Sequence, residues 1–377
     1  MTGRRIGVWL VGAWGGVATT VVVGLTALKH QLTETVGLVT ALPPFAGLDL
    51  VQWDEIVIGG HEIRETNYAA EAAQLHAQSR VFPESWSTKL ASDLQTIDAR
   101  IRPGTLHRVG GTIESLAGPK SLQFKGESAG QAVTRIAADL TAFREANQLE
   151  RQLTTNADCP LPASSLYAIA ALRCRCPHVN FTPSMGTDHP AIGEYALEQG
   201  IVHVGRDGKT GETLMKAVLA PMFAARNLHV MSWVGHNIFG NLDGKVLDDP
   251  VNKANKVRSK DHLLTEILGY KPQSLVSIEY IESMGDWKTA WDHIHFQGFL
   301  GTPMVLQFLW QGCDSILAAP LVIDLIRLAE REARRGVKGI MGHLASFFKS
   351  PMGCEEPAFA LQYQQLLQWA AEVAKSK

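Results

Sequence analysis

The sequence predicts an α/β protein with a doubly wound parallel sheet and an inserted α+β domain. Three observations support this fold class: an apolar run at 6–11 leads through glycines into a helical segment, strands and helices alternate up to about residue 225, and the texture changes between about 228 and 318. Repeated strand–helix alternation implies parallel strands covered by helices on both faces. The longer loops and the basic run after residue 228 indicate a second domain.

The first element is a strand at 6–11, which the turn Gly12-Ala13-Trp14-Gly15-Gly16 joins to a small-and-apolar helix at 17–28. Backbone N–H groups at such a helix start favour an anion, for example a pyrophosphate. This order fits a Rossmann-like dinucleotide site, although Trp14 and Val17 stand where glycine is usual. The next expected strand, at 35–40, does not end in Asp or Glu. Two interpretations stay open here, nucleotide binding and an ordinary strand–helix turn.

The alternation continues through the middle of the chain. Helical periodicity predicts helices at 129–146, 162–173, 190–198 and 211–225, and short apolar runs predict strands at 149–154, 178–182 and 201–205. A further strand is expected at 274–281, and helices at 320–335 and 356–374 close the chain. These elements predict a dinucleotide-binding domain over 1–212 and 319–377, split by an inserted domain over 213–318.

Composition limits the function classes. The chain has 377 residues, and 46% of them are hydrophobic, which is enough to bury a core. With 35 basic and 37 acidic side chains, its net charge is close to zero, so it has no strong overall electrostatic field. Neither nucleic acid nor a membrane surface is therefore an expected partner. Polar interruptions make the apolar stretch 302–326 a buried core segment rather than a membrane span, and the apolar run at 6–11 is too short for a signal peptide. Five cysteines without a disulfide or zinc pattern indicate a reducing cytoplasm.

Five later segments place a charged group beside loop-forming residues. They are 205–211, 240–244, 256–260, 284–288 and 343–352. The spacing of Lys256 and Lys260 puts both ammonium groups on one helix face, which suits a phosphate or a developing oxyanion. The alternative for this pair is a solvated basic turn, and the alternative for Lys349 is a surface lysine of an amphipathic helix.

In order and wording these segments resemble the myo-inositol-1-phosphate synthase family, in its compact prokaryotic form. The matching stretches are GRDGKTGET for the family's GDD-x-KSGQT, FGNLDG for LGNNDG, NKVRSKD for SKEISKS, GDWK for GDSK and SFFKSPM for SYWLKAPL. Upstream, GGHEI at 59–63 and LTTNAD at 153–158 resemble GGWDI and LWTANTE. There are two departures. The glycine turn is GAWGGVA instead of GxGGNNG, and Arg206 replaces the first acid of the aspartate pair.

The resemblance implies an NAD-dependent enzyme that cyclises D-glucose 6-phosphate to 1D-myo-inositol 3-phosphate without net redox change. The C5 hydroxyl is oxidised, the resulting enolate attacks the C1 aldehyde, and the C5 ketone is reduced again. The family also implies a homotetramer joined through the inserted sheet, including 274–281, and a monovalent or divalent cation near Asp207 whose ligands stay unknown.

The site residues that the resemblance implies fall into three groups. The catalytic group is Lys256, Lys260, Lys288, Lys349 and Asp207; the substrate-binding group is Lys209, Thr210, Asn241 and Asp243; the cofactor-binding group is Gly12, Ala13, Trp14, Gly15, Gly16, Val17 and Asn156, with Asp207 and Asp243.

Each lysine has an expected role in that chemistry. Lys256, with Asp207, moves the proton at O5, and Lys349 stabilises the O5 enolate. Lys288 meets the C1 oxygen and protonates it after ring closure, and Lys260 holds the phosphate. Fixed cations suit this reaction because each step develops negative charge on an oxygen.

Three other functions stay open. One is a related cyclase or isomerase for another sugar phosphate, suggested by Arg206 and Trp287 beside retained lysines. A second is a plain NAD-dependent dehydrogenase, which would release reduced cofactor. The third is a nucleotide-binding regulator without catalysis, which would need none of the lysines. The histidines at 229, 236, 293 and 295 are loosely spaced, so we expect structural roles rather than metal ligation.

Overall fold

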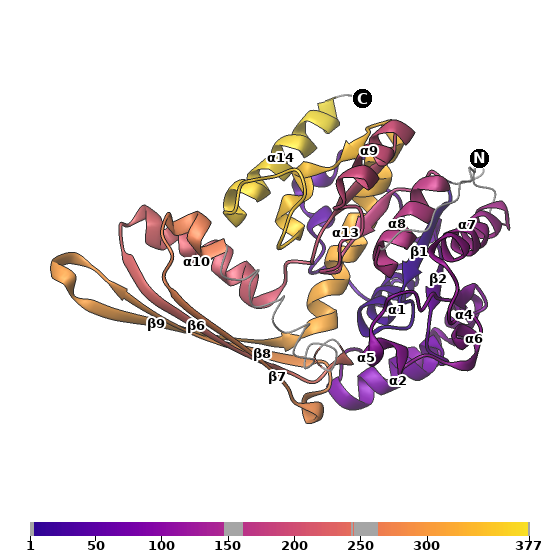
Figure 1. Cartoon of the computed structure of the whole chain (residues 1–377), viewed down its shortest axis with the longest axis horizontal. Helices are drawn as coiled ribbons and strands as arrows, with labels where there is room; N and C mark the ends of the chain where they lie inside the picture. The colour runs from indigo at the N-terminus through magenta and orange to yellow at the C-terminus, as the bar shows by residue number, and fades with distance from the viewer. Residues whose placement is uncertain (1–3, 147–160, 243, 245–262, 376–377) are drawn as a thin grey trace.

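The computed structural model describes residues 4–146, 161–242, 244 and 263–375, which form three sheets and their covering helices (Figure 1). The strands are β1 Ile6–Val11, β2 Ile56–Glu62, β3 Ile101–Pro103, β4 His178–Asn180, β5 Val202–Gly205, β6 His229–Phe239, β7 Gln273–Tyr280, β8 Trp287–Gln297, β9 Pro303–Cys313 and β10 Gly339–Ile340. The α-helices are α1 Gly16–Lys29, α2 Tyr68–Ser79, α3 Ser85–Lys89, α4 Ala91–Asp98, α5 Gly111–Glu114, α6 Pro119–Leu122, α7 Ala129–Ala146, α8 Ala163–Arg173, α9 Pro190–Gln199, α10 Gly211–Ala225, α13 Asp314–Arg334 and α14 Phe359–Lys375. Short 3-10 helices include η1 Val39–Ala41, η3 Trp53–Glu55 and η6 Gly342–Phe347.

The first sheet is parallel, in the order β1-β2-β3, and confirms the predicted strand at 6–11 and the helix after the glycine turn. Glycine is required at position 60, where β2 passes β1 and the turn. A Cβ there would lie 2.5 Å from the Leu10 carbonyl oxygen and 2.7 Å from the Ala13 Cβ. The turn thus lies directly against the carboxyl end of β2.

The prediction of a strand at 35–40 is wrong. Residues 39–41 form the 3-10 helix η1, because the buried Asp324 of α13 accepts hydrogen bonds from the Val39 N–H at 2.7 Å and the Thr40 N–H at 3.0 Å. Burial raises the pKa of Asp324 to about 6. The true second strand, β2, ends in Glu62, so an acid does close it.

The second sheet is parallel in the order β10-β5-β4. It confirms the predicted strands near 178–182 and 201–205, and α7, α8, α9 and α10 confirm the predicted helices. The strand predicted at 149–154 lies outside the described residues. Because β10 comes from the end of the chain and pairs with β5, the two halves of the sequence share this sheet.

The third sheet has the order β7-β6-β8-β9, with β6 and β7 parallel and the other pairs antiparallel. It confirms the strand predicted at 274–281 and extends away from the other two sheets (Figure 1). Alternate side chains such as Trp233 and Ile294 are buried against Phe223 of α10. Successive strand residues point to opposite faces, so the other set of side chains lies on the face away from α10.

The apolar stretch 302–326 is only partly the buried core that we expected. Its first half is the edge strand β9, in which Val305 is 51% and Leu309 66% exposed. Its second half lies in α13, which begins at Asp314 rather than at Pro320. The early start is stabilised from outside the helix, since Asp286 accepts hydrogen bonds from the Ser315 N–H at 3.0 Å and the Ser315 hydroxyl at 2.5 Å. Among the described residues, none of the helices combines the length and apolar character needed to cross a bilayer.

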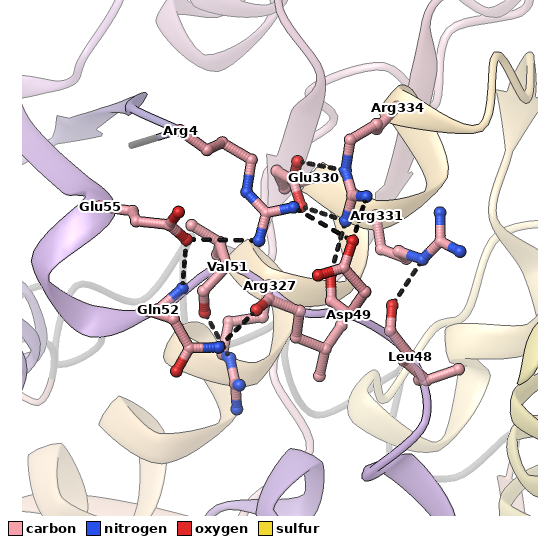
Figure 2. A network of polar contacts seen from close by, with 11 residues as sticks. Arg4, Leu48, Asp49, Val51, Gln52, Glu55, Arg327, Glu330, Arg331 and Arg334 are labelled. Atoms are coloured by element: carbon pink, nitrogen blue, oxygen red, sulfur yellow. Dashed lines mark hydrogen bonds and ion pairs between the residues drawn. The ribbon is translucent and has the colours of Figure 1, made fainter. Parts of the chain in front are cut away.

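Arginines of α13 fix the segment that precedes β2 (Figure 2). Arg331 Nε donates to the Leu48 carbonyl at 2.6 Å, Arg327 Nε donates to the Val51 carbonyl at 3.2 Å, and Arg334 pairs with Asp49 at 2.7 Å. The helix that starts beside Asp286 therefore also holds the loop that leads into the first sheet.

Candidate active site

Two loops far apart in the sequence are joined by backbone hydrogen bonds at the carboxyl end of β5. The Lys349 N–H donates to the Asp207 carbonyl at 2.7 Å, and the Lys209 N–H donates to the Phe347 carbonyl at 2.8 Å. This pairing brings Lys349 Nζ to 2.9 Å from Asp207 Oδ1, with both side chains largely buried. Two of the predicted catalytic residues thus form an ion pair, which the structure holds rigidly through the main chain.

A small cavity lies between these loops, the start of α10 and the third sheet. Its lining residues are Thr210, Glu212, Thr213, Asn237, Phe239, Ile278, Lys288 and Lys349. The strand residues among them share one face of the sheet, because Phe239 pairs with Lys288 and Asn237 pairs with Ile278 across neighbouring strands. The cavity brings together three predicted site residues, Thr210, Lys288 and Lys349.

Lys288 is held at this cavity by an aromatic ring and a carboxylate. Its Nζ lies 5.0 Å from the centre of the Phe239 ring and 3.8 Å from Asp314 Oδ1. Asn241 donates through Nδ2 to the other oxygen of Asp314 at 3.2 Å, so Asp314 links two predicted site residues. Asp314 is not among the predicted site residues, because its only signal in the sequence is a charge inside an apolar stretch.

Asn237 was also missed. Its side chain is 1% exposed and lines the cavity, and both its amide oxygen and its amide nitrogen lack a hydrogen-bond partner among the described residues. Leaving buried polar atoms unpaired costs about 1–3 kcal/mol each. This amide is therefore well suited to meet a hydroxyl or oxyanion of a bound molecule. The sequence holds no clear signal for Asn237, since β6 also carries His229, Ser232 and His236.

The start of α10 supplies the polar end of the cavity. Thr210 is the N-cap residue but makes no side-chain cap hydrogen bond, so its hydroxyl is not used to close the helix. A helix N-terminus favours an anion, and this one opens on the cavity. Glu212 of the first turn is paired with the buried Lys216 at 2.6 Å, so its charge is compensated within the helix.

The structure does not bring Lys209 to this cavity. Its side chain is 4% exposed and Nζ donates to Gln362 of α14, with the ring of Phe359 5.9 Å away. Burial lowers the pKa of Lys209 to about 8. The side chain thus joins α10 to α14 instead of pointing toward substrate.

Replacing Lys209 with Met is expected to leave the KM for the sugar phosphate within about threefold of wild type. It should also change the dependence of stability on pH. The unfolded chain binds the lysine proton up to pH 10.5 and the folded chain only up to about 8, so wild-type stability rises with pH across that window. Denaturant unfolding at both ends of the window should therefore show an extra rise of up to about 3 kcal/mol in wild type over K209M. A tenfold rise of KM in K209M would instead indicate that the Lys209 ammonium group contacts the substrate.

The glycine turn has the geometry of an anion site at the carboxyl edge of the first sheet. The N–H groups of Gly12 and Ala13 donate to the His61 carbonyl at 2.9 and 3.0 Å, and Gly12 has a φ of 77°, which favours glycine. Gly15 is the N-cap of α1 and no side chain caps this helix. The first-turn N–H groups are thus available to a pyrophosphate, and these residues fit the dinucleotide that the sequence predicts.

Glu62, at the end of β2, organises this turn and was missed because the second strand was expected elsewhere. Its carboxylate accepts hydrogen bonds from the N–H groups of Trp14 at 2.9 Å and Ile63 at 2.8 Å. The Trp14 indole donates to Asp98 at 2.8 Å. Trp14, unusual in a glycine-rich turn, therefore anchors the turn to α4.

The glycine turn and the strand that carries Lys288 lie next to each other. A Cβ on Gly16 would lie 4.0 Å from Asp286 Oδ1, and Asp286 precedes Lys288 by two residues. Burial raises the pKa of Asp286 to about 6. The Asp286 N–H donates to the Ser79 hydroxyl oxygen of α2 at 2.7 Å. A dinucleotide on the turn would thus end close to the catalytic cavity.

Arg206, the departure from the aspartate pair, has its own partner. Its Nε lies 2.7 Å from Asp188 Oδ2, and Nη1 donates to the Pro183 carbonyl at 3.0 Å. The guanidinium charge is therefore balanced by Asp188, and Arg206 does not line the cavity.

Several predicted residues lie outside the part of the chain that the structure describes. They are Lys256, Lys260, Asp243 and Asn156. Within the described ranges, no group of three or more His, Cys, Asp or Glu side chains could hold a metal ion. Of the four loosely spaced histidines, His236 contacts the Ser277 hydroxyl at 2.6 Å and stacks on Trp291, a packing arrangement rather than a ligand set.

Comparison with known families agrees with this geometry. Two family models, both described as myo-inositol-1-phosphate synthase, match residues 6–158 and 211–315, and the first of them represents the NAD-binding domain. The chain is 32% identical to inositol-3-phosphate synthase 1 of Bacteroides thetaiotaomicron over 92% of its own length and 90% of that protein.

Solved structures share the fold. An inositol-3-phosphate synthase from Caenorhabditis elegans matches 98% of this chain and 86% of its own with a TM-score of 0.85 at 20% identity. A myo-inositol-1-phosphate synthase-related protein from Thermotoga maritima matches 98% of this chain and 99% of its own with a TM-score of 0.76 at 24% identity. With an α/β fold of this kind, an NAD-binding domain and a relative that matches nearly its whole length, the chain belongs to the myo-inositol-1-phosphate synthase family.

Proposed function

We propose that this protein converts D-glucose 6-phosphate to 1D-myo-inositol 3-phosphate with NAD as a cofactor that is regenerated in each turnover. The observation that carries the proposal is the cavity where Lys288 and the Lys349–Asp207 pair meet beside the start of α10. Cationic groups at fixed positions in a water-poor cavity suit a reaction whose intermediates carry negative oxygens.

NAD, when bound, supplies the chemistry of taking a hydride from C5 and returning it there. The residues that would hold it are those of the turn Gly12, Ala13, Trp14, Gly15, Gly16 and Val17, with the α1 N-terminus facing the pyrophosphate. Asn156 and Asp243 are further proposed cofactor residues, because the family pattern suggests contacts at both positions.

Lys349 and Asp207 act at the C5 oxygen. The Asp207 carboxylate, 2.9 Å from the Lys349 ammonium, accepts a proton or returns it, and Lys256 is proposed to share that transfer. The Lys349 ammonium stabilises the enolate oxygen once the C6 proton has left. The backbone pairing of the two loops keeps this ion pair in place, so no reorganisation is needed as the charge develops.

Lys288 acts at the C1 oxygen. Asp314, 3.8 Å away, directs the ammonium group, which protonates the C1 alkoxide after the C6–C1 bond has formed. Asn237, with both amide atoms unpaired among the described residues, orients a sugar hydroxyl in the same cavity.

The phosphate group is proposed to bind at the N-terminus of α10. Thr210 offers a hydroxyl that is not used as a helix cap, and Lys260 would add a charge. Asn241, a further proposed substrate residue, is linked to Lys288 through Asp314. With the phosphate at one end and Lys288 and Lys349 along the cavity, both ends of the sugar have a defined partner.

The deciding experiment is incubation of the protein with glucose 6-phosphate and NAD, followed by phosphorus NMR. We expect an inositol phosphate signal with no net release of reduced cofactor. Net accumulation of reduced cofactor at turnover would indicate a plain dehydrogenase. Product from fructose 6-phosphate but not from glucose 6-phosphate would indicate a different sugar phosphate cyclase or isomerase.

The exposed face of the third sheet is proposed to join four subunits into a homotetramer. Away from α10 it carries Leu275 at 54%, Val305 at 51% and Leu309 at 66% exposure, with Trp291 between them on the same face. Several large apolar side chains on one flat face are typical of a subunit interface.

Replacing Leu309 with Lys is expected to dissociate the tetramer, because it would bury a charge in the interface. Sedimentation equilibrium of L309K should show a smaller species than wild type. L361K is the matched control, since Leu361 of α14 is also exposed but lies outside the sheet. If wild type is a monomer, or if L309K is still a tetramer, this face does not form the subunit interface.

We also propose two domains and a cytoplasmic location for the protein. An inserted unit over 213–318 is supported because β6 to β9 lie within it, and α13 returns to pack on α1 of the dinucleotide-binding part, 1–212 and 319–377. A cytoplasmic location is supported by the described cysteines, which are free thiols.

A further inference from the structure

A second cavity lies at the amino edge of the first sheet. It has a volume of about 230 Å³. Its walls come from the residues before β1, the start of β2, the last turns of α1, the 3-10 helix η3 and helix α4 with the residues that follow it. Because the three strands are parallel, this edge is opposite to the one that carries the glycine turn. The cavity is thus separate from the proposed catalytic site.

Two arginines in this cavity lack acidic partners. Arg5 precedes β1 and Arg100 precedes β3, and among the described residues neither forms an ion pair. The neighbouring Arg4 makes a clear contrast, since it pairs with Glu55 at 3.3 Å and Asp49 at 3.5 Å (Figure 2). Burial and the nearby Arg5 both lower the pKa of Arg100, so the two guanidinium groups repel each other.

The acids at the cavity compensate this charge only in part. Asp93 is already held by Lys29 at 3.0 Å and His30 at 2.9 Å. Asp54 is exposed and forms no ion pair with a described cation. With Arg5, Lys29 and Arg100 against Asp54 and Asp93, the cavity lining keeps a net positive charge.

The end of α1 does not oppose an anion here. Its last carbonyls are occupied by the chain that follows: Thr26 accepts from the His30 N–H at 3.1 Å and Ala27 from the Leu32 N–H at 2.8 Å. Apolar side chains form much of the remaining wall, among them Leu25, Ile58 and the ring of Trp53, which Arg327 covers on its face at 4.3 Å. The cavity therefore combines an apolar wall with two guanidinium groups that form no ion pair with a described residue.

We propose that this cavity is a second anion site, which binds inorganic phosphate or a small phosphomonoester as a dianion between Arg5 and Arg100. A dianion balances both charges, and the planar guanidinium group binds phosphate oxygens in pairs. The volume admits a phosphate group and a few further atoms. The site lies at the opposite edge of the first sheet from the glycine turn and shares no lining residue with the cavity of Lys288 and Lys349, so it does not depend on the proposed catalytic function.

The test is calorimetric titration of inorganic phosphate into the full-length protein and two variants. R100Q is expected to lose one phosphate site or weaken it at least tenfold, with the KM for glucose 6-phosphate in phosphate-free buffer unchanged. The control is R102Q, since Arg102 lies on β3 but donates to the Ala99 and Ile101 carbonyls outside the cavity. R102Q should bind phosphate as wild type does.

A second variant keeps the test decisive if R100Q folds poorly. Arg5 is exposed, so R5Q should fold normally and show the same loss as R100Q. Identical phosphate titrations of wild type, R5Q and R100Q would overturn the proposal. Acetate binding as tightly as phosphate would also overturn it, because a monoanion cannot balance two charges. An enzyme without inositol phosphate activity would leave this comparison unaffected.

Discussion

Glutamine in place of Lys349 is expected to lower kcat/KM for inositol phosphate formation by about a thousandfold. The Lys349 ammonium lies 2.9 Å from Asp207 and lines the proposed catalytic cavity, so the substitution removes the charge proposed to stabilise the O5 enolate. It also removes a counter-charge from the largely buried Asp207. Glutamine retains hydrogen-bonding capacity at a similar length, so the cavity should keep its shape. Initial rates measured by phosphorus NMR test this result.

Lys338 offers the matched control, because it is exposed and lies just before β10. K338Q should retain wild-type turnover. NAD affinity by calorimetry should be unchanged in both variants, since the glycine turn is untouched. A folded K349Q variant with near-normal kcat/KM would remove Lys349 from the reaction.

Methionine at position 288 should stop the reaction at a later step than K349Q. We expect turnover to fall by about a thousandfold while reduced nicotinamide accumulates to nearly one equivalent per subunit. The reason is that Lys288 is proposed to act at the C1 oxygen, after C5 has been oxidised. Methionine keeps the apolar contact with the ring of Phe239, which lies 5.0 Å from the lysine nitrogen. Absorbance of reduced nicotinamide in a single turnover measures this accumulation.

The control for this variant is K271M. Lys271 is exposed and precedes β7, at the opposite end of the sheet from Lys288. It should turn over as wild type does. Lost turnover in K288M without reduced nicotinamide would place Lys288 at the oxidation step, and unchanged turnover would exclude it from the cavity.

Local patterns were enough to predict most elements of the fold. The strand β1, the helix α7 and the strand β7 follow apolar periodicity that neighbouring residues determine. The strand expected at 35–40 failed because Asp324, almost three hundred residues away in sequence, captures the N–H groups of Val39 and Thr40. The start of α13 was misplaced for a similar reason, since Asp286 stabilises it from another element.

The candidate site shows the same division. Family motifs placed Lys288, Lys349 and Thr210, which the fold brings to one cavity. The direction of Lys209 was not predictable, because it follows from a loop in which Asp207 has a φ of 61°. Asn237 was missed because its role depends on which face of the third sheet it shares with Lys288. Asp314 was missed because its contact with Lys288 joins the start of α13 to a distant strand.

The pairing of the loops after β5 and η6 has a consequence for how the protein becomes active during synthesis. Asp207 obtains its lysine partner only when the segment at 347–352 docks on it. A nascent chain that lacks this segment can fold its first sheet, since β1, β2 and β3 are complete by residue 103. The proposed site would nevertheless stay incomplete until residues 347–352 have emerged from the ribosome, so translation itself delays its assembly.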